Sequence, residues 1–250
     1  MTTLKRSLVA SELIKFTSTR AARWILIAAA GLSALAISGA VFSGGVSLTE
    51  LSTDAGLRTV LEHGGMASIM PLILGILISA GEYRHGTVVD TFLTEPRRAR
   101  VVATKLLTGA LVGVVAGLVC AIVTATTASA WYAAKDVPLD LGSTPVLRSL
   151  VGIVLWQTLY TVIGVAVGSL IRGQAVAIVS VVVWMFVAET AVSELLVSLG
   201  RWLPATAART LGNAPDAGLL PQVGAGAVLL GWAALAAVGA VVATARRDVA

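Results

Sequence analysis

Charged residues are scarce in this sequence of 250 residues. They make up 12% of the chain, whereas hydrophobic residues make up 57%. A soluble domain has charge on about a quarter of its residues, and these residues cover its surface. This chain has too little charge to cover a soluble domain of its length. We therefore predict an integral membrane protein whose exterior is largely in contact with lipid.

The residues that common catalytic and metal sites require are also few. The single cysteine, Cys120, lies in an apolar run, so it forms no intrachain disulfide and is predicted to be a small core residue. The two histidines, His63 and His85, lack metal-ligand spacing. No serine lies in a nucleophile elbow, and no Gly-Lys dipeptide occurs, which excludes a Gly-Lys-Ser/Thr phosphate loop. We expect neither an enzyme active site nor a metal or cofactor bound by this chain.

Long apolar segments, in contrast, are abundant. A helix needs ~20 apolar residues to cross ~30 Å of hydrocarbon. We predict an all-α fold with six transmembrane helices, over 24–42, 61–80, 106–130, 150–171, 175–197 and 223–245. The second is the least regular, because its uninterrupted part, 66–80, spans only about 22 Å. Glu62 and His63 are therefore expected at the membrane interface, and Pro71 is expected to kink this helix.

The distribution of basic residues predicts how these helices are oriented. Thirteen of the 18 lysines and arginines lie in the tail 1–23, the connection 81–105, the turn at Arg172 and the C-terminus. The remaining five lie in the connections on the opposite side: Arg58, Lys135, Arg148, Arg201 and Arg209. The side with more basic residues is expected to be cytoplasmic. We predict a multi-pass protein of a bacterial cell membrane with both termini inside.

The tail 1–23 has a helical pattern. Val9, Leu13 and Phe16 follow i, i+4, i+7 spacing, and basic residues flank this apolar stripe. Such a pattern is typical of a helix that lies in the cytoplasmic membrane interface. The alternative is a solvated basic tail without a fixed position.

The connection 81–105 contains signals for a short helix of its own. Gly86 suits a sharp turn, and Thr87 can cap the following helix with Asp90 three residues on. Pro96 ends that helix, because the residue before a proline is driven to extended geometry. We predict a short amphipathic helix under the membrane with one apolar face, formed by Val88, Val89, Phe92 and Leu93.

This connection resembles a known family. The spacing Glu82-x-x-x-Gly86-Thr87, followed by Pro96, Arg100 and Lys105, is similar to the cytoplasmic signature of ABC type-2 transporter permeases. The tail run SELIKFTSTRAARW is similar to the start of small actinobacterial members, and RWLPATAARTL resembles their last external loop. The resemblance covers essentially the whole chain.

The resemblance implies a subunit with six spans, two such subunits per transporter, and a cytoplasmic ATPase beneath each. The coupling helix that docks into the ATPase would lie in the connection 81–105, with coupling residues Glu82, Tyr83, Arg84, Gly86, Thr87, Phe92, Pro96 and Arg100. The tail would form an elbow helix that includes Glu12, Lys15 and Arg20. The region from Glu189 to Leu203 would include a re-entrant element on the outer side.

The resemblance also implies partners and a function. ATP and magnesium would bind the partner ATPase, and the second half of the transporter would be another copy or a paralogue. We expect contact with membrane lipid and no nucleic-acid partner. The function is then export of an apolar or amphipathic substrate. The alternatives are an ion-coupled carrier, a non-transporting sensor or immunity protein, and an intramembrane hydrolase.

Polar and small residues within the spans are the remaining candidates. Glu189 and Glu194, near the outer end of the fifth span, form a predicted polar lip or lie in water at the interface. Glycines at four-residue spacing let helix backbones approach closely. The residues with a predicted role in helix packing or in a substrate pathway are Gly109, Gly113, Gly117, Gln157, Tyr160, Gly164 and Gly168.

Overall fold

The computed structural model describes residues 9–14, 19–42, 47–86, 93, 95, 97–216 and 218–246. Within these ranges all regular structure is helical, and no strand occurs. Six helices are long and apolar enough to cross a membrane. The predictions of an all-helical fold and of six spanning helices are therefore confirmed, and the chain is a multi-pass membrane protein.

Four of the spans are single helices: α2 (Arg20–Phe42), α7 (Arg98–Ala134), α8 (Thr144–Leu170) and α13 (Gln222–Arg246). The second span combines α4 (Asp54–Glu62), a 3₁₀ segment η1 (His63–Ser68) and α5 (Ile69–His85). The fifth combines α9 (Gln174–Val183), a π-helical segment η2 (Trp184–Ala188) and α10 (Glu189–Leu195). Three short helices complete the fold: α3 (Leu48–Leu51), α11 (Val197–Gly200) and α12 (Pro204–Leu211).

The second span begins earlier than its apolar residues indicate. Pro71 is the third residue of α5, in the first turn, where a missing backbone N–H is tolerated. The residues before α5 continue the span as the 3₁₀ segment η1, whose Gly64, Gly65, Ala67 and Ser68 are buried. Because these residues are small, the 3₁₀ segment fits inside the bundle without being strongly apolar. This is why its sequence has a low hydropathy.

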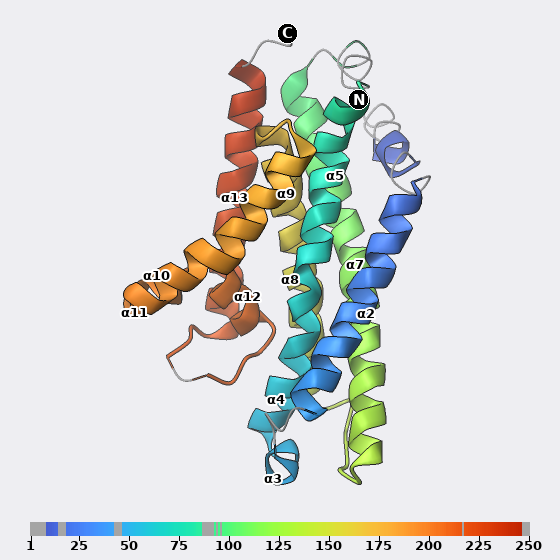
Figure 1. Ribbon diagram of the computed structural model, residues 1–250, viewed down its shortest axis with the longest axis vertical. Coiled ribbons are helices and arrows are strands. Elements are labelled where there is room, and N and C mark those ends of the chain that lie inside the picture. Colours follow the sequence, from blue (N-terminus) through green and yellow to red (C-terminus); the bar gives the residue numbers. More distant parts are fainter. Residues whose placement is uncertain are drawn as a thin grey trace.

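Helix α8 occupies the centre of the bundle and contacts α5, α7 and α13 (Figure 1). Glycines permit two of these contacts. A side chain at Gly113 or Gly117 of α7 would meet the α8 backbone, with the added Cβ only 2.7 Å from the Cα atoms of Thr158 and Val154. Gly164 and Gly168 of α8 face the backbone of α5 in the same way. The helices can approach this closely because no side chain stands between them.

The fifth span leaves the bundle part-way along its length. Figure 1 shows α9 beside α8 and the continuation through α10 to α11 pointing obliquely away from it. The change of direction coincides with η2, a π-helical segment of the kind that bends helices. The chain then returns as α12, which packs against α13 and α8.

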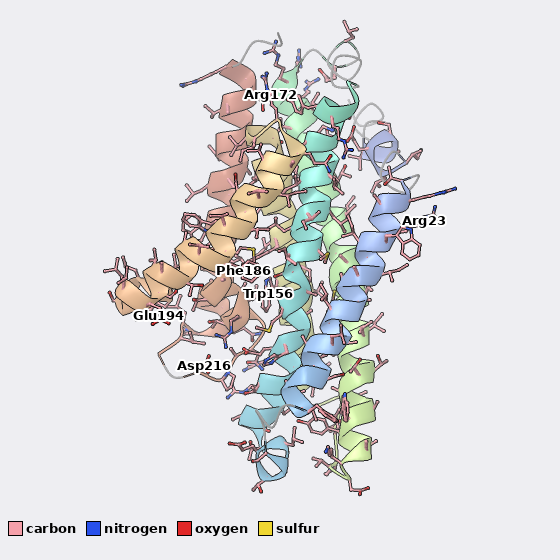
Figure 2. The ribbon with its side chains drawn as sticks, in the orientation of Figure 1. Arg23, Trp156, Arg172, Phe186, Glu194 and Asp216 are labelled. Carbon is pink, nitrogen blue, oxygen red and sulfur yellow. The ribbon has the colours of Figure 1, made fainter. Side chains whose placement is uncertain are left out.

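Several helix ends meet at one end of the bundle. These are the first residues of α2 and α7 and the last residues of α5, α8 and α13 (Figure 1). Arg23 and Arg172 lie toward the same end (Figure 2). This end therefore has the basic character that the sequence assigns to the cytoplasmic side, and the side of the membrane that it faces stays a prediction.

Candidate functional site

A buried lysine joins three segments of the chain at the basic end of the bundle. The Nζ atom of Lys105 on α7 lies 3.0 Å from Glu12 Oε2 and 3.0 Å from Glu82 Oε2. It also donates a hydrogen bond to the carbonyl oxygen of Ile78 at 3.2 Å. Glu12 belongs to the helical run 9–14, whereas Glu82 and Ile78 belong to α5. We call Glu12, Glu82 and Lys105 the Lys105 cluster.

The Lys105 cluster satisfies the requirements of a buried ammonium. Lys105 is only 5% exposed, and Glu12 and Glu82 are each 8% exposed. The Nζ atom of Lys105 donates hydrogen bonds to Glu12 Oε2 and to the carbonyl of Ile78, and Glu82 adds an ion pair at 3.0 Å. Buried charges persist only when they are paired and hydrogen-bonded in this way. The cluster therefore fixes the N-terminal helix against the two helices that flank the connection from α5 to α7.

Residues at both ends of the connection from α5 to α7 make further contacts. Gly86 ends α5 in the left-handed conformation, with φ of 70°, and its N–H bonds to the carbonyl of Glu82. The Arg172 guanidinium lies over the ring of Tyr83, 5.5 Å from its centroid. At the other end, Arg100 pairs with the buried carboxylate of Glu95 at 3.5 Å.

The central part of the predicted coupling segment cannot be compared with the structure. Thr87, Phe92 and Pro96 lie outside the described residues, and so do Val88, Val89 and Lys15. Leu93 and Glu95 are described, and Leu93 is 76% exposed. The amphipathic helix under the membrane and the docking role of its apolar face stay predictions.

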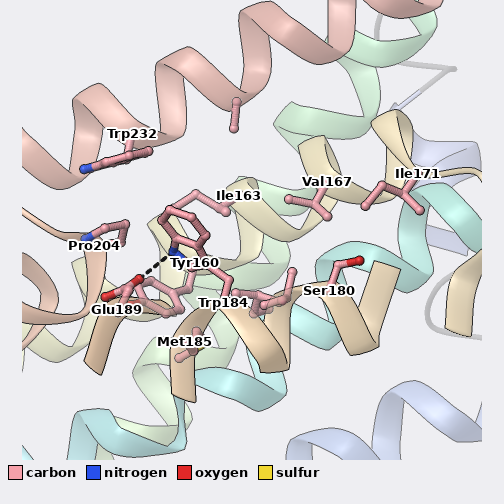
Figure 3. Close-up of a pocket in the computed structure, with 13 residues that line it drawn as sticks. Tyr160, Ile163, Val167, Ile171, Ser180, Trp184, Met185, Glu189, Pro204 and Trp232 are labelled. Carbon is pink, nitrogen blue, oxygen red and sulfur yellow. Dashed lines mark hydrogen bonds between the residues drawn. The ribbon is translucent and has the colours of Figure 1, made fainter. Parts of the chain in front are cut away.

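The predicted packing residues divide between two surroundings. Gly109, Gly113 and Gly117 lie against α8, and Gly164 and Gly168 lie against α5. Gln157 is fully buried and donates from Nε2 to the carbonyl of Gly65 at 3.4 Å. Tyr160 instead lines a cavity between α8, the fifth span and α13 (Figure 3).

The two glutamates of the predicted polar lip do not lie together. Glu189 is 3% exposed. Its Oε1 accepts from Trp184 Nε1 at 2.8 Å and its Oε2 from the backbone N–H of Ala205 at 2.7 Å. Glu194 is exposed near the far end of α10 (Figure 2). The interpretation of Glu189 as a residue in water is wrong in this structure, because the returning α12 covers it.

An ion pair that the sequence does not indicate lies toward the opposite end. Arg209 of α12 contacts Glu62 Oε1 at 3.0 Å and Asp216 Oδ2 at 3.1 Å. Burial lowers the pKa of Arg209, but the two carboxylates raise it by more, so the net shift is upward. Glu62 is 3% exposed and separated from Arg209 by 147 residues, so no local spacing predicts the pair.

The cavity beside Tyr160 has a volume of about 340 Å³. Its walls are largely apolar, and Glu189 is the only carboxylate among the described residues that line it. Figure 3 shows Tyr160, Trp184, Glu189 and Trp232 near one end, and Ile163, Val167 and Ile171 following α8 away from them. Such a cavity has space for an elongated apolar molecule with a small polar group.

Comparisons with known proteins add no assignment. No model of a known protein family matches the chain, and no curated protein matches its sequence. No group of histidine, cysteine and acidic side chains suited to a metal ion occurs among the residues the structure describes. A function must therefore be argued from the motifs and from these contacts.

Proposed function

We propose that this chain is the membrane-spanning permease subunit of an ATP-driven ABC exporter, with ATP and magnesium bound by a separate ATPase subunit. The observation that supports the proposal most directly is the Lys105 cluster. Its three residues match positions of the permease motifs, and the Lys105 ammonium lies 3.0 Å from a carboxylate oxygen of each glutamate.

The cluster suits a subunit that receives a mechanical input at the connection 87–97. A partner that moves this connection would act on the end of α5 and the start of α7, because the connection joins these two helices. Lys105 couples both of them to the N-terminal helix through buried contacts. Buried contacts of this kind are costly to break, whereas exposed ion pairs are weak.

The cavity beside Tyr160 supports an apolar or amphipathic substrate. It lies between three spans and is lined mainly by aliphatic and aromatic side chains. Residues of the fifth span next to it are exposed on the outside of the bundle, with Trp184 44% and Phe186 64% exposed. A substrate dissolved in the bilayer would therefore have a short route to this cavity.

One observation favours an ion-coupled carrier as the second candidate. Glu189 is a buried acid on a membrane helix, and such residues are common in proton and ion pathways. Against this, both of its carboxylate oxygens already accept hydrogen bonds from fixed donors. A carrier would transport without ATP and would stop when its coupling acid is neutralised.

A cross-linking experiment tests the permease proposal. Leu93 is 76% exposed, so a photoactivatable thiol reagent can be attached to Leu93→Cys in a Cys120→Ser background. In membranes of the natural source, it should cross-link to a polypeptide with a Gly-Lys-Ser/Thr phosphate loop, identified by mass spectrometry. Leu141→Cys, exposed between α7 and α8, is the matched control and should not. Cross-linking of Leu93→Cys to no such polypeptide would overturn the proposal.

A further inference from the structure

The polar end of the cavity has an unusual combination of side chains. The Trp184 and Trp232 rings lie 6.4 Å apart, tilted by 56°. Tyr160 and the carboxylate of Glu189 line the same end of the cavity (Figure 3). Three aromatic rings and one acid thus surround this end of the cavity, and the rest of its lining is apolar apart from Ser180.

Both oxygens of Glu189 accept hydrogen bonds, which suits the ionised form, and no basic side chain of the described residues contacts this carboxylate. Its two hydrogen-bond donors, Trp184 Nε1 and the N–H of Ala205, are both neutral. Ala205 lies in the first turn of α12, whose dipole supplies about half a positive charge. No ion pair to Glu189 occurs among the described residues. A buried carboxylate without a full counter-charge is costly, so a cation in the cavity would be stabilised.

Tyr160 supplies one of the aromatic rings at this end. Its side chain is 1% exposed, and its hydroxyl has no hydrogen-bond partner within the described part of the chain. A buried hydroxyl without a partner is destabilising. The ring itself packs edge-on against Trp156, at a centroid distance of 6.2 Å. The hydroxyl oxygen itself is buried, so Tyr160 contributes its ring, held against Trp156, to this end of the cavity.

The remaining wall is a row of aliphatic side chains. Ile163 and Val167 of α8 and Ile171, which directly follows this helix, recur every four residues and line the cavity. The helical part of this row, from Ile163 to the end of α8 at Leu170, is about 10 Å long. Val181 and Met185 of the fifth span line it as well. The cavity therefore continues from its acidic, aromatic end along an apolar row.

From these features we infer that the cavity is a binding site for a lipophilic cation. The cationic group lies at the Glu189 end against the faces of Trp184 and Trp232, and the apolar part lies along Ile163, Val167 and Ile171. Aromatic rings attract cations through their faces, most strongly when water is excluded. An anion of the same shape would be repelled by Glu189, and a neutral molecule would gain neither interaction. This inference deepens the proposed function. The identification of the cation as a transport substrate rests on that proposed function.

A binding measurement on the purified full-length chain tests this site. Radiolabelled decyltrimethylammonium is titrated into the protein in nanodiscs of zwitterionic lipid, and binding to empty nanodiscs is subtracted. We expect saturable binding, with decyl sulfate and decyl maltoside competing about tenfold less well or worse. Equal competition by decyl sulfate would overturn the inference, because it would show that the site does not distinguish charge.

Two variants place the site in the cavity. Val167→Phe fills the apolar row and should abolish saturable binding, whereas Val179→Phe, 60% exposed on α9 and outside the cavity lining, should leave it intact. Glu189→Gln should remove the preference for the cation over decyl maltoside. If Glu189→Gln does not fold, the comparison of Val167→Phe with Val179→Phe still tests whether the ligand binds in the cavity. Unchanged affinity in a folded Val167→Phe variant would overturn the assignment.

The experiment separates this inference from the proposed function. Binding is measured without ATP and without any partner, so it does not depend on an ATPase subunit. Loss of selectivity for the cation would overturn the site and leave the Leu93 cross-linking result standing. Selective binding together with absent cross-linking would establish the site and overturn the ABC permease.

Discussion

Lys105 on α7 and Glu12 in the N-terminal helix are 93 residues apart in sequence, and their Nζ and Oε2 atoms lie 3.0 Å apart in the structure. Both side chains are buried. The contact gives the N-terminal helix a fixed position against the bundle, where the sequence alone left a solvated tail as an alternative. Glu82 makes the second contact of the same ammonium.

Removal of the lysine should destabilise the protein severely. Lys105→Ala leaves Glu12 and Glu82 buried without their counter-charge, and breaking a buried ion pair in this way costs about 3–5 kcal/mol. We expect a large decrease in the thermal unfolding temperature, measured by size-exclusion chromatography of heated, detergent-solubilised protein. Lys135→Ala removes an exposed lysine and serves as the control. An equal unfolding temperature for both variants would contradict the role of the cluster.

Replacing a glycine of α7 with a large residue tests the packing of α7 against α8. A Cβ at Gly113 would lie 2.7 Å from Thr158 Cα and 2.9 Å from Thr161 Oγ1. Gly113→Leu should therefore force the two helices apart, and overpacking typically costs about 1–3 kcal/mol. We expect a lower yield of monodisperse protein. Gly31→Leu on α2 is the control, because a Cβ there has no neighbour within 4 Å; similar losses in both variants would argue against a specific contact.

The contacts that the sequence predicts are local, and those that it misses are distant. Six spans follow from hydropathy, and the glycines of α7 predict that another helix approaches it closely, although they do not identify that helix as α8. The early start of the second span does not follow from hydropathy, because the charge of Glu62 is compensated by Arg209 on another helix. Burial of Glu189 depends on a backbone N–H of Ala205, which has no signature in the sequence. Partners that come together only in three dimensions leave no periodic pattern to detect.

The pair between Arg209 and Glu62 should contribute more than the pair between Arg209 and Asp216. Glu62 is 4% exposed at its side chain and Asp216 is 53% exposed. Arg209→Ala leaves a buried carboxylate unpaired, with an expected cost of about 2 kcal/mol or more. Asp216→Ala removes an exposed pair and should cost less than about 1 kcal/mol. Thermal unfolding in detergent compares the two variants, and a larger effect of Asp216→Ala would refute this ranking.

The orientation in the membrane is open to direct measurement. Arg84 and Lys135 are both exposed, the first at the basic end of the bundle and the second just after α7. The excess of basic residues predicts that position 84 is cytoplasmic and position 135 external. Single cysteines in a Cys120→Ser background are treated with an impermeant thiol reagent on intact cells. Position 135 should be labelled, and position 84 only after the cells are opened; the reverse pattern would invert the topology.

Coupling to an ATPase gives the most specific expectation for Glu82. In Glu82→Gln, Lys105 keeps its contacts with Glu12 and with the Ile78 carbonyl, so the protein should insert and remain folded. The end of α5 loses its ionic link to α7, and communication with the connection 87–97 should suffer more than stability. We expect a decrease of about tenfold in substrate-stimulated ATP hydrolysis by vesicles that contain both subunits, with basal hydrolysis unchanged. Glu194→Gln, exposed near the far end of α10, is the matched control and should stimulate hydrolysis normally. Full stimulation in the Glu82→Gln variant would mean that the Lys105 cluster is structural and takes no part in coupling.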